Sequence, residues 1–414
     1  MTRATGTGPF RLLMYGLILA SAAAQFALVP IMPVYAHRLG LSGFQQGLVL
    51  GATGLATLGV SVPAGALSDR FGARRITLAA GLLMAAATLG QALAGNFPAL
   101  LAARLAFGAG YGVLWTAGLC WLAAGANGPR ALGGSVASAG VGGVAGPAVS
   151  GALTEHLGLA VPLLAAGAGF AVITAGLAVL RVPPDPIAPR REAATTSLRA
   201  AGRDRGVIGA TAAVVTAGLS TGACALLVPA QLHLAGASPG QIGLAFAAAG
   251  ILFAVGSALT TAVGRRAVNL PVTGLAMLAL TAALWIGVLS TASLMLIVML
   301  CAATAARSVL WTVSYPLAAT AAERRGLGLG AAVGLLNGIW AATAVLGPLG
   351  AGLAAEHLGA RAAFGLTAAA CAAALAVTTA AWRTRTPGLQ ARGAADRVPG
   401  RDPATASAAP RAVP

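Results

Sequence analysis

The chain has 414 residues, of which 58% are hydrophobic and only 8% charged, and its formal net charge is +17 at pH 7. A soluble domain is about a quarter charged, so this sequence lacks the polar residues that cover a water-facing surface. The composition excludes a soluble globular protein and predicts one that crosses a membrane many times.

Apolar stretches of about 20 residues, each long enough to cross a bilayer as a helix, follow one another along the chain. The first six are expected at 12–34, 47–67, 76–94, 99–122, 132–154 and 159–180. Six more are expected at 207–232, 242–263, 270–289, 294–317, 327–353 and 362–382. The predicted fold class is an all-α membrane protein with twelve transmembrane helices in two six-helix halves.

The halves are predicted to occupy 1–181 and 207–382. Between them, 182–206 is rich in proline and charge and is expected to form a cytoplasmic linker. The tail, 383–414, has no apolar periodicity and is expected to be disordered. The first span has features of a signal peptide, but its apolar run continues to Val34 and has a counterpart in the second half, so we expect it to be retained.

Arginine supplies all of the positive side chains, because the sequence contains no lysine. Twelve spans place 22 of the 26 arginines on one side, which is therefore predicted to be cytoplasmic and to hold both termini. Arg38 and Arg361 fall on the other side, and Arg104 and Arg307 lie within spans. A basic face opposite anionic lipid headgroups explains the charge without nucleic acid.

A short repeat relates the two halves. The segment "EHLG" occurs at 155–158 and 356–359, and each copy follows a Gly-Pro step, at 146–147 and 347–348. Parallel duplication of six-helix halves is a known way to build a transporter with a binding site between the halves. We expect the Glu-His pairs to mark the outer ends of the fifth and eleventh spans as inherited structure rather than as chemistry.

Several motifs resemble those of the major facilitator superfamily, in order and at the right spans. "GALSDRFGARR" at Gly65–Arg75 resembles the family signature, with Ala73 at a position that is usually basic. "RLAFGAG" at Arg104–Gly110 resembles the motif of the fourth span, and "VPIMPVYAHRLG" in the first is typical of the drug:proton antiporter branch. The fifth span has the glycine spacing of the antiporter motif, with Ser150 where glycine is usual. The motif residues there are Gly133, Gly142, Gly146, Pro147 and Gly151.

In that family the loop between the second and third spans acts as a latch that stabilises one conformation of an alternating-access cycle. The resemblance carries this role to Gly65, Asp69, Arg70, Gly72, Arg74 and Arg75. Asp69 is expected near a helix N-terminus of the other half, where backbone N–H groups favour an anion. Gly65 is expected to let the second span approach a helix of that half. The second-half equivalent, "GSALTTAVGRR", has no acid.

The residues that would couple transport to protons are not evident. A proton-coupled carrier usually has a titratable group in its cavity, yet all nine acids here lie in loops or at span ends. Gln25 stands where related antiporters often carry an acid. The remaining candidates are Arg104 and, at the outer ends of the first and seventh spans, His37 and His233. Proton coupling therefore rests on the resemblance.

Polar and aromatic residues at helical spacing mark a candidate substrate cavity. An arginine deep in a span should face protein or water, because exposure to lipid costs at least ~2.5 kcal/mol. Steps of three, four or seven residues place neighbouring candidates on one helix face. The cavity candidates are Gln25, Tyr111, Trp115, Arg307, Trp311, Tyr315, Asn337 and Trp340.

The sequence thus predicts a monomeric exporter of a drug or metabolite in a bacterial inner membrane, with a small-molecule substrate, protons and the lipid bilayer as partners. No Walker loop occurs, so ATP drive is not expected. The four cysteines lack metal-ligand spacing, so neither a metal nor a cofactor is implied. Two alternatives remain open: a facilitator or importer of the same fold, and a non-transporting membrane sensor or structural protein.

Overall fold

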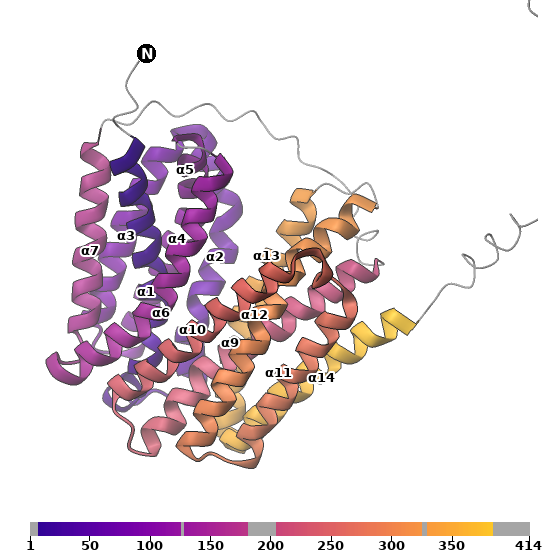
Figure 1. The fold of residues 1–414 in the computed structure, drawn as a ribbon. Helices are drawn as coiled ribbons and strands as arrows, with labels where there is room; N and C mark the ends of the chain where they lie inside the picture. Colours follow the sequence, from indigo (N-terminus) through magenta and orange to yellow (C-terminus); the bar gives the residue numbers. More distant parts are fainter. Residues whose placement is uncertain (1–6, 126–127, 181–203, 325–328, 384–414) are drawn as a thin grey trace, which may run out of the picture.

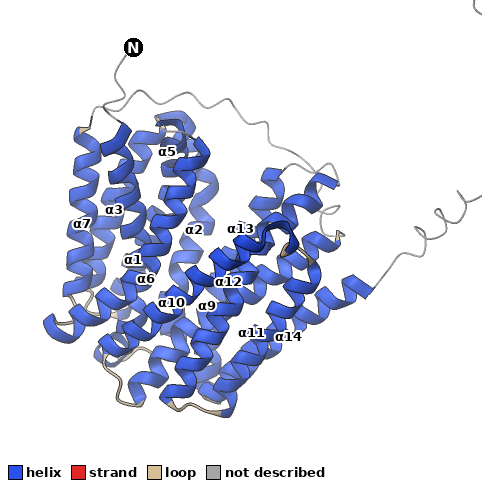
Figure 2. Cartoon of the chain, viewed as in Figure 1, coloured by secondary structure: helices blue, strands red, loops and turns tan. Residues whose placement is uncertain are grey.

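The computed structural model describes residues 7–125, 128–180, 204–324 and 329–383. Regular structure in these residues is helical, and they contain no strand (Figure 2). The predicted fold class is confirmed. The predicted linker, apart from 204–206, and the predicted tail, apart from residue 383, lie outside the described residues.

The helices form two groups (Figure 1). The first group consists of α1 (Thr7–Leu39), α2 (Gly43–Phe71), α3 (Ala73–Leu93), α4 (Phe97–Val113), a π-helical turn (Leu114–Gly118), α5 (Leu119–Gly125), α6 (Gly128–Leu157) and α7 (Val161–Val179). The second consists of α9 (Arg205–Leu234), α10 (Pro239–Val263), a 3-10 turn (Gly264–Arg266), α11 (Leu270–Leu289), α12 (Ser293–Arg324), α13 (Leu329–Leu358) and α14 (Ala360–Arg383).

Among the described residues, 11 helices are long and apolar enough to cross a membrane. Helix α2 supplies a twelfth span when its two parts, Gly43–Ser61 and Pro63–Phe71, count as one helix bent by 52°. Proline removes a helical hydrogen bond, which explains a bend at this point. The predicted fourth span consists of α4, the π-helical turn and α5, so this span is less regular than the sequence suggests.

Two of the long helices begin with the same local structure. Ser42 accepts the N–H of Gln45, and the Gln45 side chain accepts the N–H of Ser42 in return. Ser238 and Gln241 form the same capping box at the start of α10. The repeat therefore includes the hydrogen bonds that cap these two helices. Both caps lie at the end of the bundle where α1 ends and α2 begins, which we call the α1–α2 end. The opposite end is the α2–α3 end.

The two groups pack closely at the α1–α2 end, which lies lower in Figure 1, through α2 with α13 and α6 with α10. A Cβ atom on Gly47 of α2 would overlap the backbone oxygen of Pro348 on α13. A Cβ atom on Gly243 of α10 would overlap that of Pro147 on α6. The proline of each repeat therefore meets a glycine of the opposite group, and such backbone contact is possible only where the side chain is absent.

These close contacts stop about half way along the helices. Gly54 of α2 still meets Ala341 of α13, and Gly250 of α10 meets Val144 of α6. Farther toward the α2–α3 end, a set of glycines on the same helices has no described atom within 4 Å of a Cβ position: Gly59, Gly65, Gly133, Gly140, Gly334 and Gly338. The groups also diverge there in Figure 1. The structure is closed at the α1–α2 end and splayed at the other.

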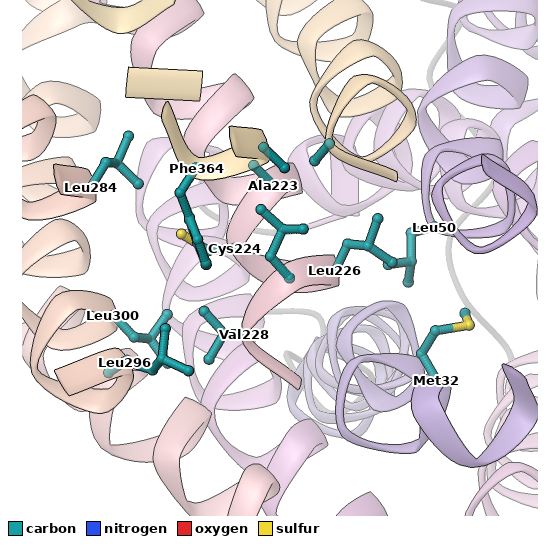
Figure 3. Close-up of a cluster of buried hydrophobic side chains, with 14 of the residues drawn as sticks. Met32, Leu50, Ala223, Cys224, Leu226, Val228, Leu284, Leu296, Leu300 and Phe364 are labelled. Atoms are coloured by element: carbon teal, nitrogen blue, oxygen red, sulfur yellow. The ribbon is translucent and has the colours of Figure 1, made fainter. Parts of the chain in front are cut away.

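An apolar core continues from one group into the other at the closed end. Met32 of α1 and Leu50 of α2 belong to the same buried cluster as Leu226 and Val228 of α9 and Phe364 of α14 (Figure 3). Dispersion contacts between these side chains add to the glycine contacts. Apolar side chains therefore join the two groups at this end in addition to the backbone contacts.

The glycine contacts generate a direct test of this packing. Gly47→Ala forces α2 away from α13 and is expected to destabilise the protein by about 1–3 kcal/mol, as overpacking does elsewhere. Gly59→Ala on the same helix adds a methyl group to open space and is expected to be neutral or slightly stabilising. Thermal unfolding in detergent measures both, and equal melting temperatures would contradict the close packing.

Candidate functional site

Arg104 links α4 to α1 in the interior of the first group. Its side chain is 1% exposed, and its Nη2 donates to the backbone oxygen of Gln25 at 2.8 Å and to the Gln25 Oε1 at 3.1 Å. Nε and Nη1 of Arg104 have no hydrogen-bond partner within the described part of the chain. Gln25 thus serves as an acceptor for a buried cation, and bonds of this charge-assisted kind are strong.

A row of aromatic rings extends from Arg104 along the fourth span. The guanidinium carbon lies 5.1 Å from the centroid of the Phe107 ring, within the range of a cation–π contact. Tyr111 follows at 6.1 Å from Phe107, and Trp115 at 5.9 Å from Tyr111. Trp115 lies in the π-helical turn, a distortion often found at functional sites. Phe107 was not among the predicted site residues, although its spacing of three residues from Arg104 was a usable signal.

Arg307 occupies the corresponding place on α12. Its side chain is 9% exposed, and its Nη2 donates to the Oγ1 of Thr304 at 2.7 Å. Its Nη1 is buried and has no hydrogen-bond partner among the described residues. The thiol of Cys224 on α9 lies close enough to interact electrostatically with the guanidinium. A buried donor without an acceptor is costly, and Arg104 and Arg307 both contain such a donor.

The predicted aromatic residues of the second group come together around α12 and α13. Trp311 stacks on Tyr315 at 6.1 Å with an interplanar angle of 14°, and its ring lies 6.3 Å from Trp340 of α13. The hydroxyl of Tyr315 donates to the Oδ1 of Asn337 at 2.7 Å. Four of the cavity candidates therefore form a single contact network, and its two members on α12 lie one to two helical turns beyond Arg307.

The two buried arginines differ in what faces them. The segment "ALVPIMP" of α1 aligns with "LLVPAQL" of α9 at a shift of 199 residues, which pairs Gln25 with Cys224. An amide oxygen is a good acceptor and a thiol a weak one. Among the described residues, one arginine is thus bound by a neighbouring helix and the other only by a threonine of its own helix, and both retain unbonded donors.

No described carboxylate is placed to neutralise either arginine. The acids in the described helices and caps lie at helix termini: Asp69, Glu155, Asp204, Glu323 and Glu356. Within the described residues, no three His, Cys, Asp or Glu side chains approach one another as a metal site requires. The charge at the centre of the molecule is therefore cationic.

The turn between α2 and α3 has a defined structure. Gly72 has φ of 88°, a conformation that favours glycine, and its N–H donates to the carbonyl of Ser68 at 2.9 Å to end α2. The Nη2 of Arg74 donates to the carbonyls of Ala178 at 2.8 Å and Leu180 at 3.2 Å, where α7 ends. Gly72 and Arg74 of the signature thus organise the first group itself.

The other signature residues face outward in this structure. Asp69, Arg70 and Arg75 are exposed, and Arg70 lies over the ring of Phe71 at 5.1 Å. Gly65, which was expected to touch a helix of the other group, has no described atom within 4 Å of its Cβ position. The groups are splayed at this end, so the expected approach is not made in this conformation.

The glycine motif of α6 has two kinds of neighbour. Cβ atoms on Gly142 and Gly146 would overlap backbone oxygens of α1. Ser150, which stands where glycine is usual, donates its hydroxyl to the backbone oxygen of Ala27 on α1 at 2.7 Å. Gly151 lies against Pro239 of α10 in the other group. The motif therefore joins α6 to α1 and to the opposite group at once.

Comparisons with known proteins agree with this architecture. The sequence model of the Major Facilitator Superfamily matches residues 14–331 and 210–411. A protein of Bacillus subtilis (strain 168), described as the uncharacterized MFS-type transporter YuxJ, is 34% identical over 139 residues, which make up 32% of this chain and 35% of that protein. The matched segment thus spans about a third of this relative.

Solved structures show the same fold at low identity. A bacterial homologue of the human lysosomal transporter Spinster, in an inward-facing and unoccupied conformation, superposes with a TM-score of 0.76 at 16% identity, over 93% of this chain and 100% of that one. The nucleoside transporter NupG superposes with a TM-score of 0.72 at 12% identity, over 91% and 100%.

Two groups of membrane-spanning helices around a polar, cationic centre define a polytopic membrane transporter. This chain belongs to the Major Facilitator Superfamily. Members of that family carry small molecules across membranes and are not enzymes.

The contact between Arg104 and Gln25 can be tested by thermal unfolding in detergent. Gln25→Met keeps the size of the side chain but removes an acceptor from a buried cation, and hydrogen bonds to charged groups contribute about 1.5–3 kcal/mol. We expect a loss of stability in that range. Gln25→Glu keeps an acceptor and adds an opposite charge, so it should remain at least as stable as the parent. A fully stable Gln25→Met variant would show that the contact contributes nothing.

Proposed function

We propose that this protein exports a drug or metabolite from the cytoplasm of a bacterium across the inner membrane, in exchange for protons, by alternating access. The observation that carries the proposal is the packing of the α6 motif on α1. Gly142 and Gly146 bring the two helices to backbone contact, and the motif they belong to is associated with export in the family that this chain resembles.

The arginine distribution supports an orientation. Under the positive-inside rule, the α2–α3 end faces the cytoplasm and both termini lie there. The halves at 1–181 and 207–382 then move against each other about the site, with 182–206 as a cytoplasmic linker. The structure is splayed at the α2–α3 end, so in this orientation it represents the state open to the cytoplasm. In the proposed cycle, Asp69 and Gly65 pack against the other half in the opposite state, which is closed to the cytoplasm. A latch at this loop would stabilise that state.

Arg104 is the proposed coupling residue. It joins α1 to α4, and α1 is in turn fixed to α6, so a change in its hydrogen bonds would move the helices that carry the antiporter motif. Arginine stays protonated in proteins, so its proposed role is to modulate a neighbouring proton site through its charge, in a region of low dielectric where electrostatic interactions are strong.

Arg307 and its neighbours are the proposed substrate contacts. The unbonded Nη1 donor of Arg307 would be satisfied by an anionic group, and the rings of Trp311, Tyr315 and Trp340 offer a surface for the rest of a small molecule. This arrangement favours acidic or amphoteric substrates over lipophilic cations.

Two other functions are compatible with the family. A facilitator or importer would use the same fold and latch, and NupG is a nucleoside transporter of that fold. A sensor that does not transport would have no need for a latch that moves. The α6 motif favours export over both, and a monomer is sufficient because each chain contains both halves.

Everted membrane vesicles test export directly, because their cytoplasmic face is outside. Uptake of a panel of acidic, amphoteric and cationic compounds is expected only with an imposed proton gradient. Gly146→Leu should reduce this uptake at least tenfold, because it pushes α6 from α1. Gly140→Leu on the same helix, where a Cβ meets no described atom within 4 Å, should retain uptake. Equal uptake by the two variants at equal protein levels would contradict the role of the motif.

The two arginines are expected to differ in their effects. Arg307→Ala should weaken substrate binding to purified protein at least tenfold, since it removes the proposed anion contact. Arg104→Ala should leave binding within about threefold but abolish uptake driven by the proton gradient. Tryptophan fluorescence titration in detergent, set beside vesicle uptake, separates binding from coupling. Unchanged binding by Arg307→Ala would show that Arg307 is a structural charge.

A further inference from the structure

The two glutamates of the repeated "EHLG" segment each reach across to the opposite group. Glu356, at the end of α13, accepts the backbone N–H of Phe44 on α2 at 2.9 Å. Glu155, at the end of α6, accepts the backbone N–H of Gly240 on α10 at 3.1 Å and the hydroxyl of Ser238 at 2.7 Å. The repeat, expected to be inherited structure without chemistry, therefore makes equivalent contacts between the groups.

The chemistry of these contacts is the same at both places. The first four N–H groups of a helix have no partner within the helix. In α2 and α10 the capping serine accepts the N–H of the third helical residue, Gln45 or Gln241. The glutamate accepts the N–H of the second, Phe44 or Gly240. A carboxylate at this point also interacts favourably with the positive end of the helix dipole.

Glycine residues allow the helix ends that carry the glutamates to come close to the helix N-termini of the opposite group. A Cβ atom on Gly240 would overlap the Oε2 of Glu155, and a Cβ on Gly352 would overlap the backbone oxygen of Gly43. Both carboxylates belong to exposed residues. The absence of a side chain at these glycines thus leaves room for a charged side chain of one group to complete the cap of a helix in the other.

We infer that Glu155 and Glu356 form a paired lock that holds the α1–α2 end closed and so sets the balance between the two states of the transport cycle. Each contact crosses between the groups, so both must break when this end opens, and the helix N-termini are then left to water. The inference rests on alternating access but on no particular substrate, direction or coupling ion. It makes the two glutamates positioning residues that act through helix movement.

The lock predicts opposite changes at the two ends of the molecule. Hydrogen–deuterium exchange of the full-length protein in nanodiscs, followed by mass spectrometry, reports both ends without labels. For the Glu155→Gln/Glu356→Gln variant we expect exchange at 43–54 and 239–250 to accelerate about fivefold or more, the size of a typical coupling between states. Exchange at 65–75 and 256–266, at the opposite end, should slow, because that end closes when the first opens.

A matched control separates a lock from a simple helix cap. Asn96 caps α4 at the same end by accepting the N–H of Ala99 at 2.9 Å, within its own group. Asn96→Ala should accelerate exchange near 97–100 and leave 65–75 and 256–266 unchanged. A variant with Asp at both glutamate positions keeps the charge but shortens the reach, and should shift exchange in the same directions to a smaller extent.

The outcomes are decisive either way. Slower exchange at the α2–α3 end in both glutamate variants, absent in Asn96→Ala, supports the lock. Faster exchange confined to 43–46 and 239–242 would reduce the glutamates to local caps and overturn the inference. The exchange measurement uses neither substrate nor gradient, so a result against the lock would leave the export proposal standing. Absence of export in vesicles would likewise leave the lock standing.

Discussion

Backbone contact between two pairs of helices is the constraint on which the rest of this structure depends. Lipid tails are as apolar as leucine, so burial of apolar surface does not drive helices together within a bilayer, and close packing must do so. Glycines on α2 and α10 allow Pro348 and Pro147 to meet the opposite group at backbone distance. Where these contacts stop, the groups separate, and the open end of the molecule begins.

This constraint also determines where along their length the two groups are joined. Glycine contacts are dense over half of the length of each helix pair and absent over the described remainder, so separation at one end need not disturb packing within either group. The same helices carry further glycines toward the splayed end, among them Gly59 and Gly65 on α2, that have no described atom within 4 Å of a Cβ position. Packed interfaces switch between discrete arrangements rather than deforming continuously, which is the behaviour that the proposed alternating access requires.

The duplicated halves also show how one scaffold yields two different sites. Arg104 and Arg307 occupy corresponding helices, and both are followed by aromatic rings. A glutamine on α1 binds the first arginine, whereas a cysteine on α9 faces the second. Both arginines keep donors without a described partner, but among the described residues it is Arg104 that a neighbouring helix binds. The proposed separation of coupling from substrate binding rests on this difference in the partners of the two arginines.

Part of the fold and of the candidate site was determined by the sequence alone. Hydropathy defined the spans, because the bilayer imposes a minimum length on each helix, and the signature motif indicated the family. The bend in α2, the π-helical turn at Trp115 and the partners of the buried arginines were decided only by tertiary structure. Gln25 shows the reason: from the sequence it was a cavity residue, but hydrogen bonding to Arg104 depends on how α1 and α4 meet. The repeated glutamates show it again, since contacts between residues some 80 to 310 positions apart exist only once the two groups are packed together.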